Sequence, residues 1–366
     1  MKNASLISLV TLSLFAAGCS DSDDGGSTGA MGTLTVLLEA EDTITQGLDA
    51  GEGVENIRDG WQARFDKYLV GIGGIDVDMA TEAGVEARAP EVYVVDMVQV
   101  PAQGLPLWTM PELREGRWNF NYVTAVDGAT RHDTVDQADF DAMVASDLTY
   151  LISGTLTKSD GVSCPPATLA QVPAGAVEAG MNAAGVPCYE NTSISFELGA
   201  EAETVFGPCE IDEQPGFSIT GNTTQSVAAT VHGDHGFFNG FPEGDEGGVT
   251  RLAQWWADSD LNLDGVVTQE ELMAIAPADL SEFDDRYQLG GSPITPVDNM
   301  WTYFRAQLKT QGHYQGEGEC PVDGVAHSHG DDHDDDHGDD HDDDHGDDHD
   351  DDHGDDHDDD HGHGHD

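Results

Sequence analysis

Basic side chains are scarce in this sequence. Its 366 residues include 13 Lys plus Arg against 72 Asp plus Glu, and the formal net charge is −59 at pH 7. Proteins that bind nucleic acid through phosphate contacts need clusters of positive charge, and so do proteins that dock on anionic lipid. The scarcity therefore excludes nucleic acid as a partner of this kind. Apolar residues make up 38% of the chain, which is enough to build a hydrophobic core.

Signatures of the common enzyme classes are also missing from the main part of the chain. From residue 33 onward there is no Gly-x-Ser-x-Gly elbow, no His-Glu-x-x-His pair and no Walker phosphate loop. Many carboxylates could form an acid pair for glycoside hydrolysis, but no spacing selects any two of them. We therefore predict that the protein is not an enzyme, and an enzyme without a known signature is the weakest alternative.

The N-terminal segment has the features of an export signal. Residues 4–18 are apolar or small and too few to span a membrane, which predicts a signal peptide over residues 1–18. The segment ends in Phe15-Ala16-Ala17-Gly18-Cys19, which resembles a bacterial lipobox with Ala16 in place of the usual Leu. This resemblance implies cleavage before Cys19, lipidation of Cys19 and, with Ser20 following, sorting to the outer membrane. The alternative is a plain signal peptide with an incidental Cys.

Residues 19–32 are mostly Gly, Ser and Asp, and we expect them to form a flexible tether. Beyond Cys19 the chain holds four cysteines, an even number that suggests two disulfides in an exported protein. They are Cys164, Cys188, Cys209 and Cys320, and three pairings are open. Cys164 and Cys188 flank a stretch rich in Pro, Ala and Gly, and their pairing would leave Cys209 to join Cys320. Free thiols or a metal–thiolate site are the alternative, but the spacing Cys-x-x-Cys is absent.

Residues 33–245 predict a β-rich domain. Short runs of β-branched and aromatic residues alternate with glycines and acidic turns, which is typical of an antiparallel, sandwich-like fold. One helix is expected over residues 136–144, and residues 165–186 are expected to be a long excursion outside the core. The expected strands cover residues 34–38, 61–65, 68–77, 92–95, 118–123, 148–152, 193–198 and 226–231.

The pattern changes in the last third of the chain. Residues 246–325 predict a helical segment, with helices near Trp255, near Leu272 and over residues 299–308. Residues 326–366 form a tail of His, Asp, Gly and Ser in which no apolar residue follows Ala326. We expect this tail to be disordered because it has nothing to bury.

Twelve residues within the helical segment resemble the calcium loop of an EF-hand. In this sequence the ligands would be Asp260, Asn262 and Asp264, the carbonyl of Val266, Thr268 and both oxygens of Glu271. Gly265 stands at the sharp bend and Val267 at the usual apolar position of the family. The resemblance implies Ca²⁺ binding, and because only one complete loop is present, a structural role. The alternative is an acidic turn that binds nothing.

The tail places histidines at a spacing of four among 21 Asp residues. Neutral imidazole suits Zn²⁺, Cu²⁺ and Ni²⁺, so the tail is a candidate metal buffer. The composition resembles the His-rich loops of bacterial zinc-uptake proteins and metallochaperones, but it implies no single ligand set. A merely solvating tail is the alternative. The candidate ligands are His333, His337, His341, His345, His349, His353, His357 and His361.

A second, sparser histidine group lies in the body of the chain. His232 and His235 need a turn between them to share a site, because residues three apart point to opposite faces of a strand. Together with His313, and with Glu317 or Asp234 as a further ligand, they would form a transition-metal site. The simpler interpretation is that they are ordinary hydrogen-bonding loop residues. The segment 312–320 beside a single EF-hand resembles the C-terminal part of uncharacterised exported lipoproteins.

These features together predict a lipid-anchored protein of the cell envelope that binds divalent metals. Ca²⁺ would occupy the loop 260–271, and the tail would gather Zn²⁺, Cu²⁺ or Ni²⁺ near the membrane. The alternative is a surface interaction or adhesion module, in which calcium shapes the binding face and the tail only keeps the protein in solution. The sequence indicates no particular protein partner.

Overall fold

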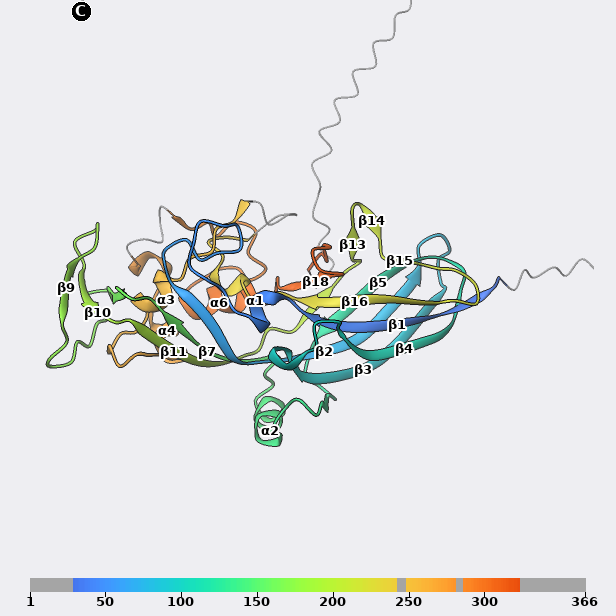
Figure 1. Ribbon diagram of the computed structural model, residues 1–366, viewed down its shortest axis with the longest axis horizontal. Coiled ribbons are helices and arrows are strands. Elements are labelled where there is room, and N and C mark those ends of the chain that lie inside the picture. The colour runs from blue at the N-terminus through green and yellow to red at the C-terminus, as the bar shows by residue number, and fades with distance from the viewer. Residues whose placement is uncertain (1–28, 242–247, 281–285, 323–366) are drawn as a thin grey trace, which may run out of the picture. The chain divides into compact units, whose positions relative to one another are not determined.

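The computed structural model describes residues 29–241, 248–280 and 286–322 (Figure 1). The described part is mainly β, as the sequence pattern predicts, and it belongs to a compact unit that ends at His327. The lipidation site Cys19, the residue expected to be lipidated, and all the tail histidines lie outside the described residues.

Two sheets carry most of the fold. The larger has nine strands and is built around β2, whose first half pairs with β7 and whose second half pairs with β5, while β3 runs along its other edge. The bounds of the strands are β1 (Met31–Ala40), β2 (Gln62–Met79), β3 (Glu86–Asp96), β4 (Leu105–Arg114), β5 (Gly116–Thr124), β6 (Thr130–Arg131), β7 (Tyr150–Thr157), β8 (Val162–Ser163), β9 (Glu178–Met181), β10 (Pro187–Glu190), β11 (Ser193–Ala200), β12 (Thr204–Phe206), β13 (Glu210–Ile211), β14 (Gln214–Pro215), β15 (Phe217–Ile219), β16 (Thr224–Val231), β17 (Val266–Val267) and β18 (Gly312–Tyr314).

A bulge in the middle of β2 lets one strand serve both halves of the sheet. The pairing register with β3 and with β5 shifts after Gly73, and Gly74 has a φ of +55°. A Cβ on Gly73 would lie 2.2 Å from the carbonyl oxygen of Glu91, so only glycine fits there. The two expected strands over residues 61–65 and 68–77 are one continuous strand, with a separate register shift against β7 between Phe65 and Lys67 at their junction.

The smaller sheet has the order β18-β16-β1-β4. Its central pair, β1 and β16, is parallel with Val36 opposite Val227, whereas β4 and β18 pair antiparallel at the two edges. The expectation of a purely antiparallel arrangement is wrong for this pair. The sequence pattern also missed β4, because Pro106 and Pro111 interrupt it; both are tolerated since β4 is an edge strand.

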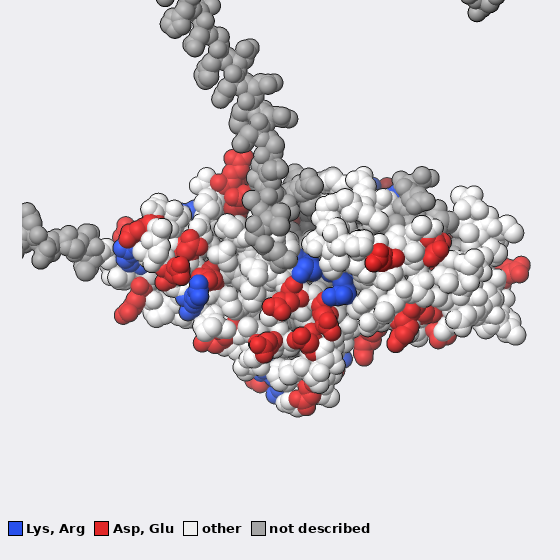
Figure 2. All heavy atoms as spheres, turned by 180° about the vertical axis from the view of Figure 1, so that it is seen from behind, with Lys and Arg blue, Asp and Glu red and all other residues white. Residues whose placement is uncertain are grey.

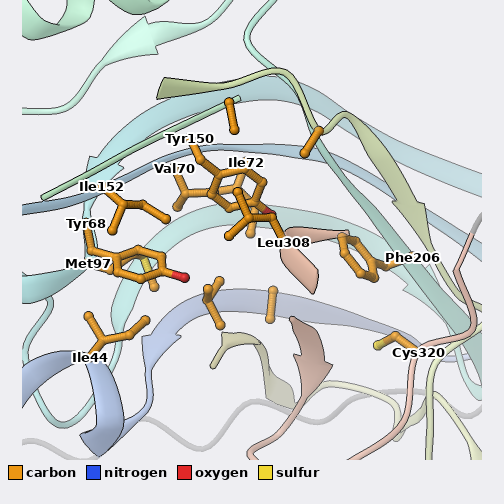
Figure 3. Close-up of a cluster of buried hydrophobic side chains, with 14 of the residues drawn as sticks. Ile44, Tyr68, Val70, Ile72, Met97, Tyr150, Ile152, Phe206, Leu308 and Cys320 are labelled. Carbon is orange, nitrogen blue, oxygen red and sulfur yellow. The ribbon is translucent and has the colours of Figure 1, made fainter. Parts of the chain in front are cut away.

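One hydrophobic core joins the two sheets. The inward residues of β1, including Leu34, Val36 and Leu38, are fully buried in the same cluster as the apolar face of β2. Figure 3 shows Tyr68, Val70 and Ile72 of β2 pointing toward side chains that come from separate elements. The labelled partners are Ile44, Met97, Tyr150, Ile152, Phe206, Leu308 and Cys320.

The helices are short and lie on both faces of the larger sheet. A second, smaller cluster holds Leu69, Val94 and Leu151 on one face under Met143 of α2, on the opposite side from α1, α3 and α6 (Figure 1). The side chain of Asn299 accepts a hydrogen bond from the N–H of Thr302, which starts α6 one residue inside the expected helix 299–308. The bounds are α1 (Asp42–Thr45), α2 (Gln137–Ala145), α3 (Gln254–Asp258), α4 (Gln269–Ala274) and α6 (Met300–Leu308), with 3-10 turns η1 (Met97–Gln99), η2 (His235–Phe237) and η4 (Pro277–Asp279).

Both pairs of cysteines are disulfide-bonded. Cys164 joins Cys188, and Cys209 joins Cys320. The first bond closes the Pro/Ala/Gly-rich excursion, which contains β9; this strand pairs with β10 in a three-stranded sheet with β8. Every residue of β9 is exposed, so this sheet adds nothing to the main core.

The acidic excess of the sequence is visible on the surface. On the face shown in Figure 2, carboxylate side chains are spread widely and basic side chains are few. Such a surface attracts cations and keeps the protein soluble. Among the described residues, no helix has the length and hydropathy needed to cross a bilayer.

The two disulfides should differ in their contribution to stability. They join residues 24 and 111 positions apart, and the loss of chain entropy in the unfolded state grows with that separation. We expect Cys209→Ala with Cys320→Ala to lower the free energy of unfolding by about 4.8 kcal/mol, and Cys164→Ala with Cys188→Ala by about 3.5 kcal/mol. Urea unfolding of both double variants measures this. A larger loss for the 164–188 pair would contradict the assignment of Cys209–Cys320 as the main covalent constraint.

Candidate metal centre

Two segments 78 residues apart in the sequence bring three histidines together. His232 directly follows β16, and His313 lies in β18, where it is paired with Thr230 of β16. The backbone N–H of His232 donates to the carbonyl of Gln311, which continues this pairing to the end of the strand. The Cys209–Cys320 disulfide then ties the segment after β18 to Cys209, whose N–H donates to the carbonyl of Phe120 in β5 of the larger sheet.

The chain turns between His232 and His235, as the spacing requires. After Gly233 it enters the 3-10 turn η2, which begins at His235. The N–H of Gly233 donates to Thr43 Oγ1, and a Cβ at this position would lie 2.6 Å from the side chain of Ile44. Glycine is therefore needed because the turn packs directly against α1.

The three rings face one another at short distances. Nε2 of His235 lies 3.2 Å from Nε2 of His313, and the ring of His313 stacks on that of His232 with centroids 3.8 Å apart. One ligand nitrogen from each ring lies within 4.8 Å of the other two. His232 and His235 are each 1% exposed, and His313 is half-buried. The arrangement is a compact nitrogen-rich cluster with one side toward solvent.

Hydrogen bonds at the outer nitrogens select the tautomers of two rings. Thr310 Oγ1 donates to the carbonyl of Gln307, so it accepts from Nδ1–H of His235 at 2.8 Å and leaves Nε2 with its lone pair. The carbonyl of Gly316 can only accept, so Nε2 of His232 donates to it at 3.1 Å. In the neutral ring, Nδ1 of His232 therefore holds the lone pair, whereas in the protonated ring Nδ1–H faces Oε2 of Glu41. Bonds of this kind orient histidine ligands around metals.

A buried ion pair supports the turn beneath the histidines. Asp234 is fully buried, and its Oδ2 accepts from Nε of Arg251 at 2.6 Å and also from Nη2. Arg251 is 4% exposed and its guanidinium lies over the ring of Phe238. Asp234 was a candidate metal ligand from the sequence. In the structure, its Oδ2 is instead paired with Arg251.

Two glutamates lie on the other side of His232. Oε2 of Glu41 is 3.5 Å from Nδ1 of His232, and Glu41, His232 and Glu317 form a second group whose ligand atoms lie within 4.8 Å of one another. Burial raises the pKa of Glu41 to about 7, while His232 and the hydroxyl of Thr43 lower it and Asp234 and Glu317 raise it. Glu317 was a candidate in the sequence, but Glu41 was missed because nothing in its local sequence marks a ligand.

Buried tyrosines form the back of the cluster. Tyr122 donates its hydroxyl to the carbonyl of His313 at 3.0 Å, and Tyr68 donates to the side chain of Gln311. Burial raises the pKa of Tyr68 and of Tyr122 well above the usual range. Burial also raises the pKa of Tyr150 to about 12, an effect that the side chains of Gln311 and Thr124 partly offset. The histidines thus rest on a neutral polar layer.

The segment expected to bind calcium is folded as a hydrogen-bonded loop. Asp260 Oδ2 accepts from the N–H of Gly265 at 2.9 Å, and Asp264 Oδ1 accepts from the N–H of Val266 at 2.9 Å. Glu271 forms a capping box with Thr268 at the start of α4, and its Oε1 accepts from the N–H of Leu261. The carboxylates therefore point back at the loop.

Calcium binding at this segment stays a prediction. In the described part of the chain, the groups whose three ligand atoms approach within 4.8 Å are the two that contain His232, and the carboxylates of residues 260–271 form no such group. Burial raises the pKa of Asp260, although hydrogen bonds from Gly265 and Asn191 oppose this effect. Three carboxylates repel one another unless a cation lies between them.

The loop is attached to the larger sheet. Val266 and Val267 form β17, which pairs in parallel with Ser195 and Phe196 of β11. Val267 is buried, as its place in the motif predicts, and the side chain of Asn191 donates to Asp260 Oδ2 at 2.8 Å. The loop therefore has a rigid neighbour on one side.

Comparisons with known proteins add no assignment. No protein-family model matches this chain, and neither the curated proteins nor the solved structures contain a match. A function for this protein must therefore be inferred from the histidine cluster and from the loop 260–271.

The buried tyrosine layer should make the protein sensitive to alkali. An exposed tyrosine ionises near pH 10, whereas Tyr150 in the folded state keeps its proton to about 12. Between these values the folded state binds more protons, so stability that is present below pH 10 is lost as the pH rises toward 12. Each such group contributes a slope of up to about 1.4 kcal/mol per pH unit.

We expect Tyr150→Phe to lose stability less steeply than the parent protein over this range, as measured by urea unfolding at several pH values. Identical slopes would mean that Tyr150 ionises normally in the folded state.

Proposed function

We propose that this protein binds divalent metal ions in the cell envelope, with a transition metal held by His232, His235 and His313. The observation that carries the proposal is the convergence of these rings from β16, η2 and β18, with two ligand nitrogens 3.2 Å apart. Two zinc-bound nitrogens at bond lengths of 2.0–2.1 Å in a tetrahedral site lie about 3.3 Å apart. The ligand spacing therefore suits a tetrahedral ion without large movement of these two rings.

The chemistry of the donors narrows the choice of metal. Three imidazoles without a thiolate favour Zn²⁺, Cu²⁺ or Ni²⁺ over Ca²⁺ and Mg²⁺, which prefer oxygen. Thr310 and Gly316 hold the outer nitrogens of His235 and His232, as expected for ligands that are oriented before the ion arrives. Without a metal, the contact between Nε2 of His313 and Nε2 of His235 is a hydrogen bond between the two rings, and a bound ion would take the place of the shared proton.

Calcium at residues 260–271 is the second part of the proposal. The matching of all twelve positions of the motif supports it, and so does the pairing of β17 with β11. In paired EF-hands the corresponding strand pairs with the other loop. Here the edge of the larger sheet would take that place, so a single loop could keep its shape and calcium would act as a structural staple.

Membrane attachment through Cys19 and metal buffering by the tail complete the proposal. Both rest on the sequence, since these residues lie outside the described part. The tail would collect ions near the membrane, and the histidine cluster would hold one ion in a defined site. The alternative is a calcium-stabilised adhesion lipoprotein, in which neither the tail nor the cluster binds metal.

The transition-metal site can be tested by zinc titration with calorimetry and native mass spectrometry. We use the full mature chain and a full-length version whose twelve tail histidines are replaced by Asn. The tail variant should retain one tightly bound Zn²⁺ per chain and lose the additional Zn²⁺ ions that the tail binds more weakly. Adding His235→Asn and His313→Asn should weaken the tight site at least about 100-fold, since even outer partners of a ligand are worth 10–100-fold in affinity.

His132→Asn is the matched control, because His132 is a body histidine that bonds Thr134 and takes no part in the cluster. This variant should bind zinc like its parent. Tight zinc binding that survives loss of His235 and His313 would refute the site, and an unchanged total stoichiometry in the tail variant would refute buffering.

The calcium site is tested with Glu271→Gln. This change keeps the side-chain shape but removes the charge that would coordinate Ca²⁺ with both oxygens. We expect calcium to raise the melting temperature of the parent chain and to have little effect on the variant. Gln269→Ala on the same helix is the control. Equal calcium stabilisation of the parent and Glu271→Gln would show that this loop is not the site.

A further inference from the structure

Glu41 is placed at the histidine cluster by the end of β1. Its N–H donates to the carbonyl of Val231 beside it, and its side chain, 18% exposed, is turned toward His232. Thr43 Oγ1 donates to Oε2 of Glu41 and accepts from the N–H of Gly233. One hydroxyl thus connects this carboxylate with the turn that carries the histidines.

Glu317 approaches from a second direction. Tyr314 and Gly318 exchange two backbone hydrogen bonds, and this closes a tight turn in which Gly316 has a φ of +87°. Glu317 lies at the exposed end of the turn, while the carbonyl of Gly316 holds Nε2 of His232. The same turn therefore positions one ligand and selects the tautomer of another.

We propose that Glu41, His232 and Glu317 form a second position for a divalent transition metal, beside the three-histidine position. One atom from each residue lies within 4.8 Å of the other two, and Nδ1 of His232 lies 3.5 Å from Oε2 of Glu41, which it faces as N–H in the protonated ring and with its lone pair in the neutral ring. A lone pair facing a carboxylate oxygen is unfavourable unless a cation or a proton lies between them. One nitrogen and two carboxylate donors suit Zn²⁺.

The two positions are alternatives for one ion. While Nε2 of His232 stays bonded to Gly316, the ring has a single lone pair, at Nδ1, which cannot bind two ions at once. Exposure falls from Glu317, which is open to solvent, through Glu41 to His235, which is 1% exposed. The carboxylate position is thus the outer one, where a hydrated ion arrives, and His232 belongs to both positions.

The test uses the full-length chain with all tail histidines replaced by Asn, in buffer with saturating Ca²⁺, and zinc as the probe. In this background His235→Asn with His313→Asn removes the inner position. We expect one Zn²⁺ per chain to remain, bound at least about 100-fold more weakly than in the parent. Adding Glu41→Gln and Glu317→Gln should abolish this binding, whereas adding Asp42→Asn and Glu319→Gln, which remove two nearby charges outside the group, should preserve it.

The inference is overturned if no zinc binds once His235 and His313 are replaced, or if binding is unaffected by the loss of Glu41 and Glu317. Failure of the proposed function is a different result, namely the absence of tight zinc in the parent of this series. If the variant with His235→Asn and His313→Asn lacks a native melting transition, the inference is tested instead by introducing Glu41→Gln and Glu317→Gln into the parent of this series. Zinc uptake, followed by stopped-flow, should then slow more than with the Asp42 and Glu319 control, and equal rates would overturn the inference.

Discussion

The pairing of β18 with β16 is the contact on which the candidate centre depends. It places His313 opposite Thr230 and brings the carbonyl of Gln311 to the N–H of His232. The Cys209–Cys320 disulfide holds the chain that follows β18 in place. Without this short strand, the two histidines after β16 would have no third ring to meet, and the turn that carries Glu317 would have no attachment.

The centre combines a rigid support with an open side. Beneath the histidines lie a buried Asp234–Arg251 pair and a layer of neutral tyrosines, all of which hold the backbone in one geometry. Toward solvent lie the carboxylates of Glu41 and Glu317. A cation reaching such a site exchanges water for preoriented ligands and offsets part of the local negative charge. Residues 260–271 combine the same two features, because this negatively charged loop is held on one side by its pairing with β11.

Much of the fold could be predicted from the chain. Alternation of apolar residues located seven of the eight strands that have eight or more residues, and the helices over residues 137–145 and 300–308 were found within one residue, because each buries one periodic face. The prolines of β4 and the irregularity of β2 between Phe65 and Lys67 interrupted the pattern, since both break local periodicity for reasons that exist only in the sheet. The parallel pairing of β1 with β16 joins strands almost two hundred residues apart, and local sequence carries no signal for it.

By itself, the sequence determined the acidic character and the four cysteines beyond Cys19, and it predicted an export signal, a calcium motif and the candidate ligands His232, His235 and His313. These are properties of composition and short spacing. Only the tertiary structure decided which cysteines pair, that the histidines meet, that Arg251 rather than a metal pairs with Oδ2 of Asp234, and that Glu41 completes a second ligand group. The physical reason is that strand pairing and burial set distances between residues remote in the chain, and a ligand set is defined by such distances.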